Sequence, residues 1–437
     1  MRVVKGYAEG RAALARRPLV DFSLPPHLAQ RLAQAFGQPL SPQEAVGRIL
    51  ADVRQQGDAA VRSYTRLLDG VAPERLEVSM EECEAALRRL PRSLRSALQV
   101  AWERAVEYHV ATLPRGWVDM QMGWGEVYVP LERVGVYIPG GTAIYPSTVV
   151  MTVVPALVAG VGEVVLCTPP RQEGPHPWIL AAAALAGAHR VFAVGGAQAI
   201  AAMAFGTESI PKVDMVCGPG NIFVTLAKQM VFGVVGVDGL YGPTETVIIA
   251  DGTATPALLA ADLLAQAEHD PLASPILITT HEPLIPRLLQ EVERQGGALP
   301  RADIARQALE GQGLVILVDS LAEAVDLANL YAPEHLCLAV ADPWRWVGEV
   351  RTAGAVFLGE GTPSALGDYT AGPSHVLPTG GTARFASGLG VHHFLRSMGI
   401  VFAREESLMK AAIALARAEG LEGHARSLAM RLRRRRS

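Results

Sequence analysis

The sequence predicts an α/β fold with two doubly wound domains and helical extensions at both ends. Its 437 residues are about three times the length of an average domain, so two or more packed units are expected. Short apolar runs alternate with Ala-rich helical patterns in two successive series, which is the order of βαβ units. Several of the runs are apolar at every position, as in parallel strands that helices cover on both faces.

The composition excludes several classes of protein. Lysine and arginine (39) nearly balance aspartate and glutamate (43), so no global field attracts nucleic acid or anionic lipid. The most apolar stretch, residues 148–167, is interrupted by Pro155 and Gly160 and is unsuited to crossing a bilayer. No secretory signal precedes the domains, and the four cysteines are isolated. We therefore expect a cytoplasmic protein with reduced, buried thiols.

Residues 1–113 are predicted to be a helical region that packs on the first α/β domain. Apolar residues recur three and four positions apart from 42 to 68 and again from 80 to 108, as on one face of a helix. Residues 134–243 are predicted to form the first α/β domain. Its strands are expected at residues 134–138, 164–167, 191–194 and 214–217.

Residues 244–385 are predicted to form the second α/β domain. Its strands are expected at residues 246–249, 276–279, 315–318, 335–338 and 355–358. Residues 386–437 follow as a helical tail, with a helix expected from 405 to 419. The four arginines at 433–436 are expected to be a solvated chain end.

Three glycine-rich turns follow predicted strands, where open α/β sheets bind ligands. Gly218-Pro219-Gly220-Asn221 also opens a helical pattern, so its backbone N–H groups could hold a phosphate. Similar turns lie at residues 138–142 and 195–198. No GxGxxG motif occurs, so the domains are incomplete Rossmann-like folds. Because such turns also occur without a ligand, both interpretations remain open.

A Gln/His pair suggests part of a metal site. Thr255 is expected to cap a helix in which Gln266 and His269, three residues apart, share one face. Both side chains could reach one cation, although such a pair is more often ordinary surface. Zinc needs three or four ligands, so others must come from elsewhere in the chain.

Further candidate ligands lie in two glycine-punctuated segments. Residues 367–375 place Asp368 and His375 in an expected loop, where Asp368 could equally close an Asx turn. Near the end of the chain, Glu419 and His424 lie five residues apart around two glycines. Neither HExxH nor CxxC occurs, so protease-type and finger-type zinc sites are not indicated.

Glu334 and His335 are adjacent at the start of a predicted strand, directly after Pro333. A carboxylate and an imidazole side by side can divide proton transfer, because histidine titrates near neutrality and a carboxylate can activate water. The alternative is a charge pair at a strand end.

Taken together, these segments resemble the histidinol dehydrogenase family. The resemblance covers nearly the whole chain and is carried by residues 53–58, 134–142, 195–198, 217–221, 242–245, 266–269, 332–336 and 367–381. Two departures from the family's pattern are Tyr241, where a small residue is expected, and the pair His392-His393, where an acid is more usual.

The resemblance implies a role for each matching residue. It implies one zinc ion per subunit, with the ligands Gln266, His269, Asp368 and His424. It implies NAD contacts at Tyr137, Gln198 and Asn221. It implies a catalytic pair of Glu334 and His335, and substrate contacts from His335, the four zinc ligands, Thr244, His375 and Glu419.

The resemblance further implies a four-electron oxidation of L-histidinol to L-histidine with two NAD, the last steps of histidine biosynthesis. His335 is expected to take the alcohol proton, and Glu334 to activate water against the aldehyde. It also implies a homodimer in which the tail, with Glu419 and His424, enters the partner's site. The main alternative is a paralogue that oxidises another zinc-held alcohol with NAD; a zinc hydrolase and a non-catalytic binding protein explain fewer of the residues.

Overall fold

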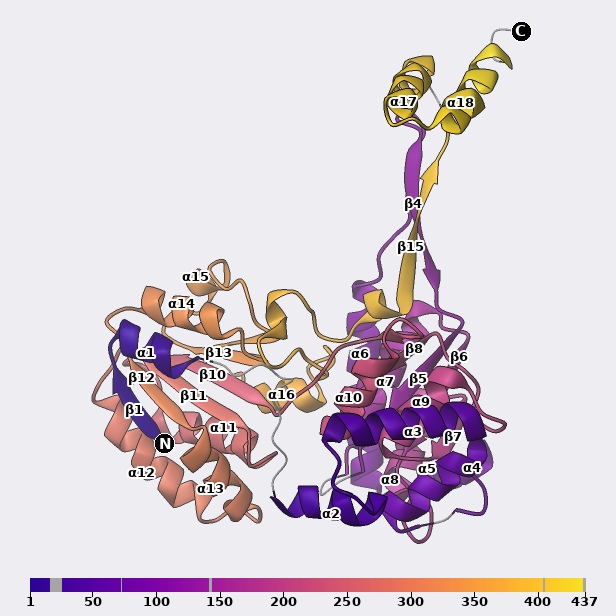
Figure 1. The fold of residues 1–437 in the computed structure, drawn as a ribbon. Coiled ribbons are helices and arrows are strands. Elements are labelled where there is room, and N and C mark those ends of the chain that lie inside the picture. Colours follow the sequence, from indigo (N-terminus) through magenta and orange to yellow (C-terminus); the bar gives the residue numbers. More distant parts are fainter. Residues whose placement is uncertain (16–25, 72, 141–143, 404, 435–437) are drawn as a thin grey trace. The chain divides into compact units, whose positions relative to one another are not determined.

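A computed structural model of the chain describes residues 1–15, 26–71, 73–140, 144–403 and 405–434. The chain divides into two compact units. The first unit contains residues 1–113 and 131–394, and the second contains 114–130 and 395–437. The predicted α/β class is confirmed, because the first unit contains two mainly parallel sheets with helices around them (Figure 1).

The first sheet has the strand order β2-β7-β6-β5-β8-β9. Its strands are parallel except for the pair β2 and β7. The order places β5 in the middle of the sheet, beside β6 and β8. The strands are β2 (Glu77–Val78), β5 (Arg133–Tyr137), β6 (Glu163–Thr168), β7 (Arg190–Ala193), β8 (Met215–Cys217) and β9 (Gly236–Val237).

The second sheet is parallel throughout, with the order β1-β12-β11-β10-β13-β14. The strands expected in both α/β domains are all present, each within three residues of its predicted bounds. The strands of the second sheet are β1 (Arg2–Lys5), β10 (Glu245–Ala250), β11 (Ser274–Thr279), β12 (Leu314–Leu317), β13 (His335–Ala339) and β14 (Ala355–Leu358).

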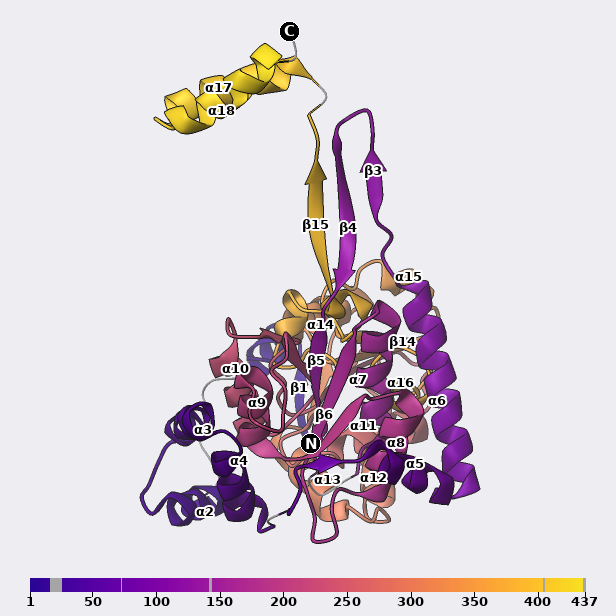
Figure 2. The same ribbon diagram turned by 90° about the vertical axis from the view of Figure 1, so that its right-hand side faces the viewer.

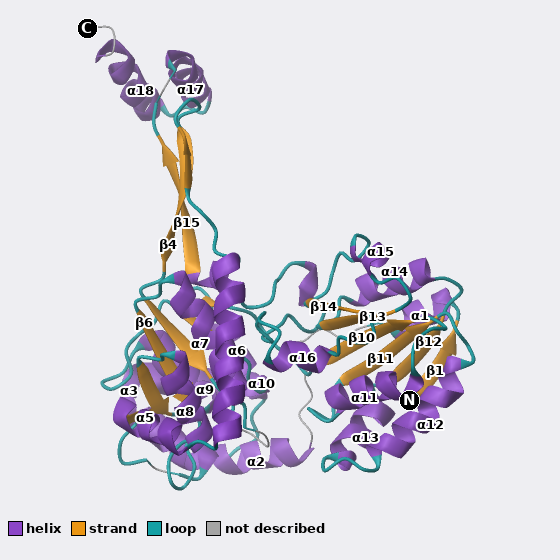
Figure 3. Ribbon diagram, turned by 180° about the vertical axis from the view of Figure 1, so that it is seen from behind, coloured by secondary structure: helices purple, strands orange, loops and turns teal. Residues whose placement is uncertain are grey.

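Burial on both faces explains why apolar residues follow one another along the strands instead of alternating with polar ones. In β10, Val247 and Ile249 belong to a buried cluster with α1 (Tyr7–Ala13) and α14 (Leu321–Tyr331). Ile248 and Ala250 belong to the cluster on the opposite face. The helices of that face are α11 (Pro256–Ala267), α12 (Leu284–Gly296) and α13 (Ala302–Gly311) (Figure 3).

Helices also pack on both faces of the first sheet. The pattern predicted over residues 42–68 is divided at Gly57, whose φ of 54° favours glycine. The helices before β10 are α2 (Pro26–Phe36), α3 (Pro42–Gln56), α4 (Asp58–Tyr64), the π-helical turn η1 (Thr65–Asp69), α5 (Met80–Arg89), α6 (Arg92–Ala111), α7 (Pro146–Ala159), α8 (Pro177–Ala186), α9 (Gly196–Phe205) and α10 (Ile222–Val231). Later helices of this unit are α15 (Trp344–Val347), α16 (Ser364–Tyr369), and the 3₁₀ turns η2 (Thr382–Arg384) and η3 (Val391–Phe394).

The start of the chain differs from the prediction. Residues 1–113 were expected to pack on the first α/β domain, but β1 pairs in parallel with β12, so residues 2–5 complete the edge of the second sheet. A four-residue strand gives too short a pattern to be recognised, and its partner lies more than 300 residues away. Helices α3 and α4 do pack on the first sheet, as expected.

The second unit is a three-stranded antiparallel sheet with two helices. The strands β3 (Trp117–Asp119), β4 (Trp124–Pro130) and β15 (Leu395–Val401) lie side by side in the order β15-β4-β3 (Figure 2). The helices are α17 (Glu406–Ala418) and α18 (Glu422–Arg434). The expected helical tail of residues 386–437 therefore includes a strand, whose partner β4 lies in a segment assigned to neither domain. The arginines at 435 and 436 lie outside the described residues.

Candidate active site

The predicted catalytic pair lies at the amino end of the second sheet. His335 is the first residue of β13, and Glu334 immediately precedes it. Thr244 immediately precedes the neighbouring strand β10. Ligands of open α/β sheets usually bind at the carboxyl ends of the strands, so this position departs from the general rule.

The carboxylate of Glu334 is buried and hydrogen-bonded. Its Oε2 accepts from the Thr244 hydroxyl at 2.6 Å and from the backbone N–H of Glu245 at 3.0 Å. Burial raises the pKa of Glu334 to about 7, although His335 and these hydrogen bonds oppose the shift. Glu334 can therefore exchange a proton near neutral pH.

Thr244 connects Glu334 to Gln266. Its Oγ1 lies 2.6 Å from Glu334 Oε2 and 2.9 Å from Gln266 Oε1, but a hydroxyl has only one proton to donate. With Gln266 Oε1 facing Thr244, both contacts are hydrogen bonds when Glu334 is protonated and donates to Thr244, which then donates to Gln266. Protonation of Glu334 and the orientation of the Thr244 hydroxyl are thereby coupled.

His335 is surrounded by carboxylates and a backbone carbonyl. Its Nδ1 lies 3.4 Å from the carbonyl oxygen of Glu245, and its Nε2 lies 3.6 Å from Asp368 Oδ1. Burial alone would lower the pKa of His335, but the charges of Glu334 and Asp368 raise it to about 9. The protonated ring is thus the stable form while both carboxylates face it.

Asp368 and His375 join the same cluster. Asp368 lies in helix α16 and not in the expected loop or Asx turn. Its backbone oxygen is 2.7 Å from His375 Nδ1, which must therefore carry a proton. The Nε2 of a neutral His375 then accepts from the Thr148 hydroxyl at 2.9 Å. A substrate group that binds His375 would take the place of Thr148.

Gln266 lies in the last turn of α11, and its Nε2 donates to Ser364, the first residue of the helix that carries Asp368. His269 follows the end of α11 at Ala267, so the predicted pair does not share a helical face. Thr255 also differs from the prediction, because its hydroxyl binds Glu360 and does not cap the helix. Burial lowers the pKa of His269, and the charge of Asp368 opposes this shift.

The donor atoms fit a divalent cation in kind. Gln266, His269 and Asp368 offer amide oxygen, imidazole nitrogen and carboxylate oxygen, all of which are ligands for zinc. In the described part of the chain, no three His, Cys, Asp or Glu side chains are grouped so that they could hold a metal ion. A cation here would depend on Gln266 and on a donor from outside this cluster.

Glu419 and His424 belong to the second unit. Glu419 is the residue at the end of α17, and His424 lies in the first turn of α18. Both are exposed in that unit. Their expected contacts with metal and substrate stay predictions.

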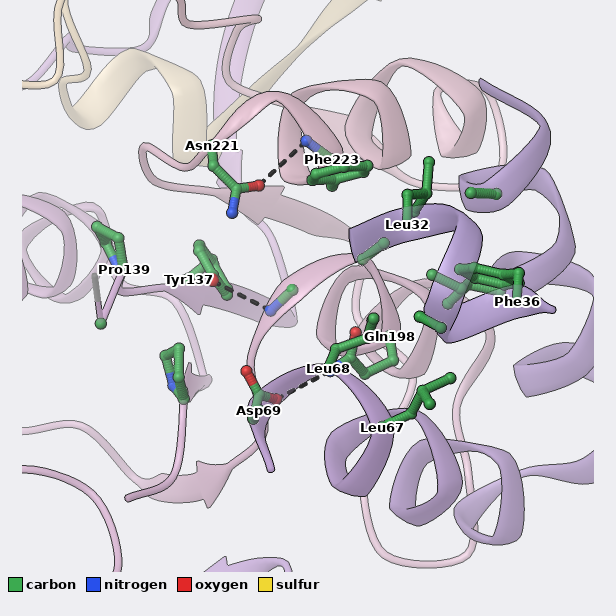
Figure 4. Close-up of a pocket in the computed structure, with 17 residues that line it drawn as sticks. Leu32, Phe36, Leu67, Leu68, Asp69, Tyr137, Pro139, Gln198, Asn221 and Phe223 are labelled. Atoms are coloured by element: carbon green, nitrogen blue, oxygen red, sulfur yellow. Dashed lines mark hydrogen bonds between the residues drawn. The ribbon is translucent and has the colours of Figure 1, made fainter. Parts of the chain in front are cut away.

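A separate cavity lies at the carboxyl end of the first sheet (Figure 4). It measures about 370 Å³ and is lined by the three residues predicted to contact NAD: Tyr137, Gln198 and Asn221. They stand at the end of β5, in the first turn of α9 and at the start of α10. The glycine turn expected at 138–142 lines it through Pro139 and Gly140; residues 141–143 lie outside the described residues.

Hydrogen bonds fix the polar side chains of this cavity. The Tyr137 hydroxyl accepts from Gly196 N–H at 3.1 Å. Asn221 caps α10 by accepting from the N–H groups of Phe223 and Val224. Gln198 Nε2 donates to Asp69 at 3.2 Å. Asp69 was not predicted, because nothing in its local sequence indicates that the turn η1 brings it here.

Tyr241, one of the two departures from the family's sequence pattern, belongs to a buried ionic network behind the 218–221 turn. Lys228 Nζ lies 2.5 Å from Asp238 Oδ1, donates to Gly218 O at 2.9 Å, and stands over the Tyr241 ring. Asp238 Oδ2 accepts from Gly218 N–H at 2.8 Å and from the Tyr241 hydroxyl at 2.9 Å. The network thus holds the 218–221 turn and the segment that leads to Thr244.

The pair His392-His393, the other departure from the family's sequence pattern, lies in η3. The two rings contact each other, and His393 Nδ1 accepts from Gly390 N–H. Both rings are partly buried, which lowers the pKa of each. They stand outside the catalytic cluster and the cavity.

Comparisons with known proteins agree on one family. The family model described as histidinol dehydrogenase matches residues 37–432. A histidinol dehydrogenase of Thermus thermophilus is 54% identical over 394 residues, 89% of this chain and 94% of the relative. One of Dehalococcoides mccartyi is 48% identical over 437 residues, 99% of this chain and 100% of the relative.

Solved structures give the same result. The crystal structure of histidinol dehydrogenase from Elizabethkingia anophelis matches with a TM-score of 0.91 and 34% identity, over 100% of this chain and 99% of that one. An acetylating aldehyde dehydrogenase from Geobacillus thermoglucosidasius, 14% identical, matches 83% of this chain and 97% of that one with a TM-score of 0.50, which concerns the fold alone. Among the described helices, none is both long and apolar enough to span a membrane.

Proposed function

Because the chain belongs to the histidinol dehydrogenase family, we propose that it oxidises L-histidinol to L-histidine in two steps, through a bound aldehyde, with one NAD reduced in each step. The observation that carries the proposal is the buried cluster of Glu334, His335, Thr244 and Asp368 in the same unit as the cavity of Tyr137, Gln198 and Asn221. One group of side chains suits proton transfer, and the other suits a nucleotide.

In the first step, the alcohol carbon loses hydride to NAD and its hydroxyl proton passes to Nε2 of His335. Nδ1 faces the Glu245 carbonyl, which fixes the ring and leaves Nε2 for the substrate. His335 must be neutral for this role. The charge of Glu334 and the carboxylate of Asp368 beside Nε2 both favour the protonated ring, so engagement of Asp368 by a cation would shift the balance towards the neutral ring.

In the second step, Glu334 removes a proton from water as the water oxygen attacks the aldehyde carbon. The hydrated aldehyde then loses hydride to a second NAD and becomes the carboxylate. Overall, histidinol, two NAD⁺ and one water give histidine, two NADH and three protons. The pKa of Glu334, about 7, suits a base that must regain its charge in each cycle.

We further propose that Gln266, His269 and Asp368 hold a zinc ion together with His424 of the partner subunit. When bound, the zinc would orient the amine and imidazole nitrogens of the substrate, without redox chemistry of its own. Thr244, His375 and Glu419 would bind the remaining polar groups of the substrate.

Exposed apolar side chains support a homodimer. In the second unit, Trp117, Met120 and Val401 are 51%, 62% and 86% exposed, and Leu415 and Met430 are 65% and 70% exposed. So much large apolar surface on a small unit is typical of an interface. A second copy of the chain that covered it would give Glu419 and His424 a site to complete.

The proposed reaction is tested with zinc-loaded protein, L-histidinol and NAD, by following NADH absorbance against histidine formed. Two NADH per histidinol are expected. NADH from another amino alcohol, with none from histidinol, would instead indicate a paralogue.

A further inference from the structure

The cavity of the first sheet has an apolar end and a polar end (Figure 4). Leu32 and Phe36 of α2, Leu67 and Leu68 of η1, and Phe223 of α10 form the apolar end. Such a slot suits a flat aromatic base. Glu334 and His335 do not line the cavity, so the reactive ring of a dinucleotide has no place in this slot. On the proposed function, the slot therefore takes the adenine end of NAD.

Asp69 and Gln198 lie at the border between the two ends. Asp69 follows Leu68 directly, so a sugar attached to a base in the slot would face its carboxylate. Gly196, Asn221 and the first turns of α9 and α10 come next, where a pyrophosphate finds backbone N–H groups. The order from base to sugar to phosphate thus follows the order of side chains along the cavity.

One polar atom at this border lacks a partner, and the neighbouring carboxylate of Asp69 can accept further hydrogen bonds. Gln198 is fully buried, and its Oε1 has no hydrogen-bond partner among the described residues. Asp69 accepts from Gln198 Nε2, and burial raises the pKa of its carboxyl to about 6, so it is mostly charged at neutral pH. A buried acceptor without a donor is costly, and a ligand with two hydroxyl groups would satisfy both.

We propose that Asp69 and Gln198 Oε1 accept hydrogen bonds from the ribose hydroxyls next to adenine, and that Asp69 thereby determines the preference for NAD over NADP. A 2′-phosphate would bring negative charge against a partly buried carboxylate and would remove a donor. Asp69 is thus a specificity-determining residue, and this role rests on the proposed function.

The test measures binding of ADP-ribose and of its 2′-phosphate to the full-length zinc-loaded protein by calorimetry. The unmodified protein should bind ADP-ribose at least about tenfold more tightly than the phosphate. Asp69→Asn keeps the size and still accepts from Gln198. It should weaken ADP-ribose about tenfold while leaving the phosphate unchanged or tighter.

Glu74→Gln is the matched control, because it removes one exposed acidic charge shortly after η1 and outside the cavity. Its ratio of the two affinities should equal that of the unmodified protein. If Asp69→Asn weakens both ligands equally, Asp69 only supports Gln198 and the proposal is wrong. Equal binding of both ligands by the unmodified protein also overturns it, even if the variant fails to fold.

Failure of the proposed function gives a different result. If Asp69 discriminates ADP-ribose from its 2′-phosphate but histidinol gives no NADH, the role of Asp69 stands and the proposed oxidation of histidinol is refuted. NADH from histidinol without discrimination between the two ligands would do the reverse.

Discussion

At the scale of single residues, the Thr244 hydroxyl lies within hydrogen-bond distance of both Glu334 and Gln266 but can donate its proton to only one of them. A Gln side chain at 334 has the same size, and its amide oxygen in the place of Oε2 can still accept from Glu245 N–H and from the Thr244 hydroxyl. It cannot act as a base. Substitution therefore separates the hydrogen-bonding role of Glu334 from its role in proton transfer.

We expect Glu334→Gln to spare the first oxidation and to slow the second by about 100-fold or more. Single-turnover absorbance should show one rapid NADH per site, followed by a slow second one, with aldehyde trapped by a carbonyl reagent. Glu310→Gln, on the exposed face of α13, is the control and should release both rapidly. Equal slowing of both steps would contradict the assignment of water activation to Glu334.

His109 gives a pH dependence that is independent of the active site. Its side chain is fully buried in α6, and neither ring nitrogen has a partner among the described residues. Burial, with a smaller effect of His392, lowers its pKa from 6.5 to about 4. The unfolded chain therefore takes up a proton below pH 6.5 that the folded chain refuses until about pH 4.

The free energy of unfolding should be highest above pH 6.5. Protonation of His109 in the unfolded chain should lower it by up to about 3 kcal/mol towards pH 4. His109→Leu removes this loss and leaves no buried nitrogen, so the variant should be at least as stable at pH 7 and should lose less on acidification. Urea unfolding at pH 7 and pH 4.5 measures both. His281→Gln, two residues after the end of β11 in the second sheet, should keep the parental difference. An unchanged difference in His109→Leu would contradict the prediction.

At the scale of elements, the strands could be predicted because helices bury both of their faces. Val247 and Ile249 pack on one face of β10, and Ile248 and Ala250 on the other, which produces an apolar run that is easily recognised. The cavity could be predicted only in part. The turns after strands indicated this edge of the first sheet, and the resemblance gave Tyr137, Gln198 and Asn221, whereas Asp69 is brought there by long-range packing of η1.

The residues of the candidate active site could also be predicted only in part from local sequence patterns. Glu334 and His335 were predicted from their adjacency at a strand entrance. No local pattern predicts that Asp368, 33 residues later, lies in a helix with its carboxylate 3.6 Å from the His335 ring. The resemblance supplied these residues, because metal and substrate ligands are set by tertiary contacts that spacing alone cannot give.

Helix α10 carries Lys228 into the interior, where it forms a buried ion pair with Asp238. Lys228→Met would leave Asp238 buried without its cation and should cost about 3–5 kcal/mol. Adding Asp238→Asn should recover part of that loss, because no charge then remains buried. Denaturant unfolding of both single variants and the double variant measures the coupling; simple additivity would show that the pair makes no net contribution.

At the scale of the whole molecule, the proposed exchange of tails predicts complementation between two defective proteins. Glu334→Gln damages the first unit, and His424→Ala damages the tail and should weaken zinc retention. In a mixed dimer, one site would combine both intact parts. Refolding equal amounts together should therefore restore about a quarter of parental histidine formation, since about half the dimers are mixed and each has one good site.

Each variant refolded alone is the control and should stay defective in histidine formation. If the mixture shows only the mean of the two separate activities, the tail acts within its own subunit. A metal content of His424→Ala equal to that of the parent would contradict the assignment of His424 as a ligand.

The pairing of β1 with β12 has a consequence for synthesis in the cell. Residues 2–5 are synthesised before their partner, residues 314–317, which follows only after more than 300 further residues. At about 5–20 residues per second, this interval is tens of seconds. Throughout it, β1 has no strand to pair with, so a nascent chain must carry an unpaired edge strand until the second sheet can close. A bulky fusion before residue 2 should therefore slow maturation more than one placed elsewhere on the surface.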